Sequence, residues 1–155
     1  MKPVKKRKYK YVLDEDYIFK SDFSKLFKKT KELKFEYEYG IIYKDRIHFN
    51  KGYAWNGCSG NVWQGKRIDQ EDWMPKLTLD SDKCTQTVPA TLIHDFMYQY
   101  LKDIKKEAEL HSLRVRKIAD KKFYSLLKRT NFKYAKMYYF GVRIFGTTTY
   151  IKRWF

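Results

Sequence analysis

Cysteine is scarce in this chain. The only two are Cys58 and Cys84, and neither belongs to a C-x-x-C pair. A disulfide framework or a four-ligand zinc site needs more cysteines at closer spacing. The scarcity excludes a disulfide-stabilised secreted domain, and a zinc site formed by Cys58, Cys84 and His94 matches no compact motif.

Long apolar runs are also missing. No segment approaches the about 18 apolar residues that a membrane span requires. Six of the first ten residues are basic, but no apolar region follows them, so a secretory signal is not supported. The expectation is a protein without a signal peptide or transmembrane segment, in a reducing compartment.

Acidic residues are the minority among the charges. The chain has 34 Lys and Arg against 18 Asp and Glu, a net charge of +16. Such a protein is attracted to nucleic acid, an anionic membrane surface or acidic proteins, although a lysine-rich solvated surface explains the same charge. Hydrophobic residues make up 43% of the chain and aromatic residues 19%, which argues against disorder.

The order of the patterns predicts a single α+β domain over residues 1–155, with a small N-terminal antiparallel sheet packed on a C-terminal pair or trio of helices. Residues 8–53 are strand-rich, 54–87 form a loop or lid, 88–146 are helical, and 147–155 form a C-terminal extension. Within the first region, residues 9–13 and 17–19 flank an acidic turn and predict a hairpin. Helices are expected over 88–105 and over 112–129 with Ser112 as N-cap, and 134–145 is a third apolar stretch of the helical region.

His94 is the most unusual residue of the first predicted helix. It lies on an otherwise apolar face, whose members are Ala90, Ile93, His94, Met97, Tyr98 and Leu101. A buried polar group costs about 1–3 kcal/mol unless it is hydrogen-bonded, so His94 requires a polar partner on another element. Asp120 is the candidate, because it shares a face of the second helix with Leu113, Arg116, Phe123 and Leu127.

Two interpretations of the His94–Asp120 pair remain open. A carboxylate that binds one imidazole nitrogen leaves the other to take a proton from water or a hydroxyl, which is the arrangement of a catalytic base. Alternatively, the pair is structural and holds two helices in register, with Tyr98 adding a hydrogen bond. Asp95 lies beside the pair near a glycine-bearing loop, a setting suited to a hard cation such as Ca²⁺. His48 and His111 look like ordinary surface residues.

Four blocks of the sequence, in this order, resemble domain-of-unknown-function family 1353, small proteins common in tailed bacteriophages and prophages. The blocks are residues 52–59, 89–98, 119–124 and 137–146. The resemblance implies a phage-type origin, with the virion or the host cytoplasm as location and other virion proteins as partners. Asn56 stands where this family usually carries Asp.

The His94-Asp95-x-x-Tyr98 motif followed by Asp120 is similar to the catalytic core of phospholipase A2, particularly its bacterial forms. That resemblance implies that His94 is the base that activates water, that Asp120 orients it, and that Tyr98 belongs to the catalytic group. It further implies a Ca²⁺ held by Asp95 and by loop carbonyls near Gly57 and Gly60. Two functions follow as expectations: a phage-encoded, metal-assisted ester hydrolase acting on envelope lipid, or a non-enzymatic virion or tail component whose basic surface docks on acidic protein or DNA.

Overall fold

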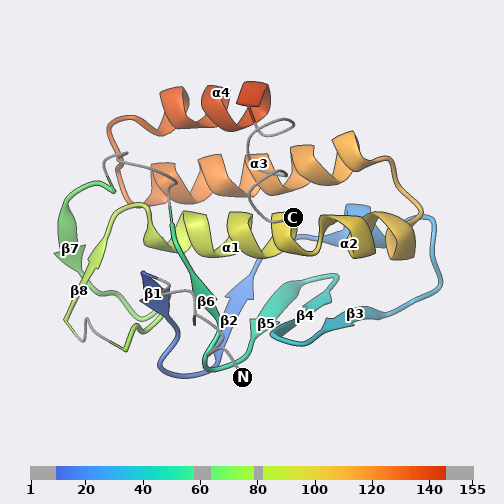
Figure 1. The fold of residues 1–155 in the computed structure, drawn as a ribbon, viewed down its shortest axis with the longest axis horizontal. Helices are drawn as coiled ribbons and strands as arrows, with labels where there is room; N and C mark the ends of the chain where they lie inside the picture. The colour runs from blue at the N-terminus through green and yellow to red at the C-terminus, as the bar shows by residue number, and fades with distance from the viewer. Residues whose placement is uncertain (1–9, 58–63, 79–81, 146–155) are drawn as a thin grey trace, which may run out of the picture.

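A computed structural model describes residues 10–57, 64–78 and 82–145. It is an α+β structure in which the helices form a layer over a small antiparallel sheet (Figure 1), so the predicted fold class is confirmed. The predicted C-terminal extension, 147–155, lies outside the described residues.

The helical layer contains four helices within the described part of the chain. They are α1 (Val88–Gln99), α2 (Leu101–Ala108), α3 (Ser112–Arg129) and α4 (Ala135–Phe145). Figure 1 shows α3 lying between α1 and α4. None of these helices combines the length and the apolarity needed to cross a membrane.

The helix boundaries correct two predictions. The single helix expected over residues 88–105 is interrupted at Tyr100, whose φ of −100° and ψ of 16° end α1 before α2 begins. The N-cap of α3 is His111 and not Ser112, because the His111 ring accepts a hydrogen bond from the Leu113 backbone N–H at 3.1 Å. The predicted range of the second helix is confirmed.

The main sheet is formed by strands from the first third of the chain. In spatial order they are β2 (Tyr17–Lys20), β5 (Arg46–Phe49), β4 (Gly40–Tyr43) and β3 (Lys34–Tyr37), all antiparallel to their neighbours. A 3₁₀ helix, η1 (Ser24–Phe27), connects β2 to the segment that leads into β3. Alternating burial along β4 and β5 places one face of the sheet against the helices.

The predicted hairpin over residues 9–19 is wrong. Strand β1 (Tyr11–Val12) pairs with β6 (Ala54–Trp55), whereas β2 pairs with β5. In the acidic turn between the two strands, the Asp16 carboxylate accepts the Lys51 backbone N–H at 2.7 Å and lies 3.2 Å from Nε2 of His48.

The segment expected to be a loop or lid, residues 54–87, contains regular structure as well. Besides β6 it holds an antiparallel pair formed by β7 (Arg67–Asp69) and β8 (Lys83–Thr85). These strands lie beside the N-terminal end of α1 (Figure 1). The hydrophobic periodicity of the sequence does not predict β7 and β8, because three residues are too few to show an alternation of apolar and polar side chains.

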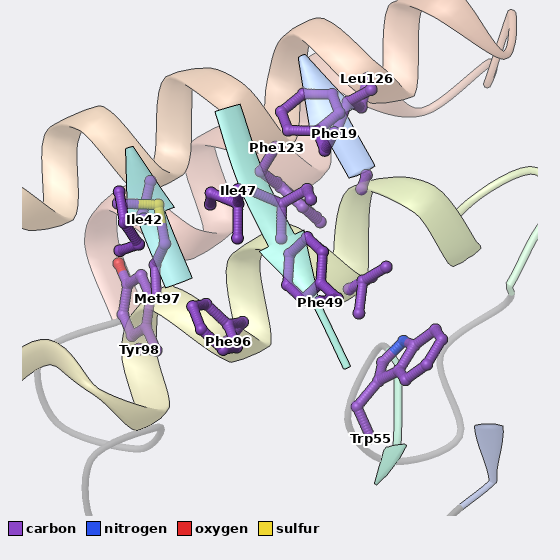
Figure 2. Packing of buried hydrophobic residues seen from close by; sticks show 14 of the residues in the cluster. Phe19, Ile42, Ile47, Phe49, Trp55, Phe96, Met97, Tyr98, Phe123 and Leu126 are labelled. Carbon is purple, nitrogen blue, oxygen red and sulfur yellow. The ribbon is translucent and has the colours of Figure 1, made fainter. Parts of the chain in front are cut away.

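The core lies between the sheet and α1 and is rich in aromatic side chains (Figure 2). Every residue from Val88 to Tyr98 is buried, so α1 is enclosed on all sides and not only along the predicted apolar stripe. On α3 the predicted inward face is buried except for Leu113, which is exposed. The buried faces of α1 and α3 determine which polar residues meet in the interior.

Candidate functional site

His94 and Asp120 meet between α1 and α3. His94 Nε2 lies 2.8 Å from Asp120 Oδ1, and the two residues are 1% and 0% exposed. The predicted pairing is therefore confirmed in its geometry. Both residues are buried, and each supplies a hydrogen-bond partner for the polar group of the other.

Asp120 also accepts hydrogen bonds from two further side chains. The Tyr98 hydroxyl donates to Oδ1 at 2.7 Å, and Arg143 Nη1 donates to Oδ2 at 2.8 Å. Both carboxylate oxygens are thus engaged, and the donors come from α1 and α4. One carboxylate on α3 connects three helices in the interior.

The hydrogen bonds determine the ionisation of the site. Burial alone raises the pKa of Asp120, but the contacts with His94, Tyr98 and Arg143 outweigh it and hold the pKa of this carboxyl below its ordinary value of 3.8. Burial raises the pKa of Tyr98, and the adjacent Asp120 charge raises it further. At neutral pH, Asp120 is therefore ionised and Tyr98 keeps the proton that it donates.

Two buried or half-buried arginines belong to the site, and the sequence interpretation gave neither a role. Arg143 is the only charged residue between Met137 and Phe145. A single charge in an apolar stretch is a sequence signal that the side chain has a polar partner in the interior. Arg116 is 2% exposed and donates from Nε to the Tyr98 hydroxyl at 3.4 Å. Its position four residues before Asp120 on α3 was a second signal, because such residues are neighbours on a helix face.

The predicted calcium ligands are only partly within the described residues. Asp95 is buried on α1, and Gly57 has a left-handed φ of +75°, which suits a loop that turns its backbone carbonyls. Gly60 lies outside the described residues. Ca²⁺ takes about six to eight oxygen ligands, and the ranges 10–57, 64–78 and 82–145 contain no group of three or more metal-binding side chains. Asp95 and Gly57 alone do not complete a calcium site.

His48, His111 and Cys84 lie apart from this site. His48 is on β5, where it contacts Asp16 at the surface, and His111 caps α3. Cys84 is buried on β8, and Cys58 is not among the described residues. Within the described ranges, no metal-binding group joins Cys84 to His94.

The lowered pKa of Asp120 predicts a pH dependence of stability. A carboxyl whose folded pKa is below its unfolded value stabilises the fold above the unfolded pKa, and this contribution is lost as the pH falls through the folded pKa. We expect the stability advantage of the wild type over Asp120→Asn to be constant near neutral pH and to shrink below about pH 4. Urea unfolding of both proteins at neutral and acid pH measures it, and an advantage that does not change with pH would contradict the assignment.

The cluster has one feature of the phospholipase A2 resemblance, since His94, Tyr98 and Asp120 lie in one hydrogen-bonded group. Comparison of the chain with protein-family models, with curated proteins and with solved structures finds no match.

Proposed function

We propose that the chain is a phage-encoded hydrolase that cleaves an ester of envelope lipid or a related substrate. The observation that carries the proposal is the contact of 2.8 Å between Nε2 of His94 and Oδ1 of Asp120, inside an apolar interior. A carboxylate in this position fixes the orientation of the ring and stabilises its protonated form. His94 is then the general base, Asp120 orients it, and Tyr98 and Arg143 hold Asp120.

The proton transfers of the proposed reaction involve only groups of this chain, water and the ester. A water proton passes to Nδ1 of His94 while the water oxygen bonds to the ester carbonyl carbon. Asp120 stabilises the imidazolium through the proton on Nε2. The bond from the carbonyl carbon to the alcohol oxygen then breaks, and the proton on Nδ1 passes to the leaving alkoxide. His94 is 1% exposed, so the chain must open around the ring to admit the ester.

Calcium dependence is part of the proposal, with Asp95 as the acidic ligand and the loop of Gly57 and Gly60 as the source of carbonyls. Bound Ca²⁺ supplies a positive charge that stabilises an oxyanion. No step above passes through the metal, because the described residues do not supply a complete set of oxygen ligands.

Turnover of phospholipid vesicles and of a simple aryl ester tests the proposal, with calcium and with a calcium chelator. We expect His94→Ala to lower the rate by about 10²–10⁴-fold, the usual contribution of a general base. His48→Ala is the matched control, because it removes a histidine that contacts an aspartate at the surface, and it is expected to keep the wild-type rate. Equal background rates for wild type and His94→Ala would overturn the proposal.

A second candidate is a non-enzymatic virion component in which the pair is structural. Its support is the burial of His94 and Asp120 together with the hydrogen bonds that connect α1, α3 and α4. Under this function, His94→Ala lowers the melting temperature without changing any rate. Mass spectrometry of purified particles is the direct test: many copies per virion favour it, and absence of the protein contradicts it.

A further inference from the structure

A hollow lies between η1 and α3, on the side of α3 that faces away from the His94 site. Its volume is about 330 Å³, and residues from β2, η1 and α3 line it. Five of its lining side chains are cationic: Lys20, Lys25, Lys121, Lys122 and Arg129. This hollow is a concave and strongly basic part of the surface.

A second hollow, of about 300 Å³, continues the first along α3 toward its N-terminal end. The two share the exposed residues Lys25 and Lys121, so they form one continuous surface, called here the basic groove. The second hollow adds four cations: Lys28, Lys29, Arg114 and Lys117. Nine cationic side chains thus line the basic groove.

A single carboxylate lies among these nine cations, and its charge acts on Lys122. Asp22 is the only carboxylate in the lining, and it accepts the Ser24 backbone N–H at 2.9 Å. Across the described residues, no carboxylate lies within ion-pair distance of any of the nine, whereas Lys83 pairs with Asp69 at 2.7 Å outside the groove. Like charges held close together repel one another, and a bound polyanion relieves that repulsion.

Lys122 marks a fixed position within the groove. Its Nζ donates to Oγ of Ser21 at 2.6 Å and lies 4.9 Å from the centre of the Phe23 ring. Burial lowers the pKa of Lys122, so an anion at this point favours its charged form. The ammonium and the hydroxyl together present two groups that bind a phosphate oxygen.

The length of the basic groove and the side chains that line it favour one class of polyanion over the others. Arg114 and Arg129 are separated by about 22 Å along α3, which matches about six phosphates of one strand of a duplex. The groove offers a membrane little apolar surface to bury, because Phe19, Leu110 and Leu126 are buried and Ile118 is half-buried. We propose that the basic groove binds the phosphate backbone of nucleic acid without selecting a base sequence. This proposal is independent of the hydrolase proposal.

Fluorescence anisotropy with a labelled, mixed-sequence DNA duplex tests it on the full chain, over a series of salt concentrations. The variant Lys25→Glu/Lys121→Glu changes the two exposed residues that both hollows share. The control Lys66→Glu/Lys102→Glu makes the same change in net charge at two exposed lysines that line neither hollow. Circular dichroism verifies that both variants are folded.

We expect the groove variant to bind the duplex at least about tenfold more weakly, and its slope of log affinity against log salt to be smaller by about two. The control is expected to bind within about threefold of the wild type, since only the general field changes. Equal losses in both variants would overturn the proposal, and so would a duplex affinity that salt does not weaken. Vesicles of phosphatidylserine are the second probe: loss of vesicle binding in the groove variant with unchanged DNA binding would assign the groove to a membrane instead.

Discussion

Replacement of Asp120 by alanine is expected to lower the free energy of unfolding by about 3–5 kcal/mol, the usual cost of removing one partner of a buried charged pair. The carboxylate is 0% exposed and accepts hydrogen bonds from His94, Tyr98 and Arg143. After its removal, the first two donors remain in the interior without this acceptor, and Arg143 keeps a charge without its counterion. Urea unfolding at neutral pH measures the loss.

Two further variants serve as comparisons for the stability loss of Asp120→Ala. Asp120→Asn preserves the shape and one acceptor oxygen, so its loss is expected to be smaller than that of alanine. Asp103→Ala removes an exposed aspartate from the first turn of α2 and is expected to cost at most about 1 kcal/mol. A loss for Asp120→Ala no larger than that of Asp103→Ala would show that the hydrogen bonds contribute little to stability, and it would contradict the structural function of the pair.

The contact between His94 and Asp120 could be predicted from the sequence because helical periodicity determines the faces of helices. A buried histidine on one helix needs a polar partner, and a carboxylate on the inward face of a neighbouring antiparallel helix can supply it. The catalytic role of the pair stays a prediction, since burial and hydrogen bonding alone serve a structural pair equally well.

Other parts of the structure depended on long-range contacts that periodicity does not encode. Residues 9–19 have the pattern of a hairpin, yet β1 and β2 pair with strands more than 25 residues later in the chain. The break at Tyr100 separates two segments that are both helical in pattern. The contact of Arg143 with Asp120 depends on how α4 packs against α3, and packing between helices has no local signature.

Replacement of Phe96 by alanine is the second change with a large expected effect, a loss of about 3–5 kcal/mol in the free energy of unfolding. Phe96 is fully buried on α1 where the helix meets the sheet (Figure 2). Its ring centre lies 4.9 Å from that of Phe49, 5.6 Å from that of Tyr53 and 4.9 Å from that of Tyr100. Three rigid rings around one position leave little freedom to fill the resulting cavity, so the loss should lie toward the upper end of this range.

Phe140→Ala is the matched control, because it deletes the same ring from a side chain of α4 that is 52% exposed. It is expected to change the free energy of unfolding by about 0.5 kcal/mol or less, as is usual for exposed positions. Thermal and urea unfolding of the two variants should therefore differ widely. Equal stability losses would show that Phe96 is not enclosed between the sheet and α1. Other packing contacts would then have to hold α1 in the position that brings His94 beside Asp120.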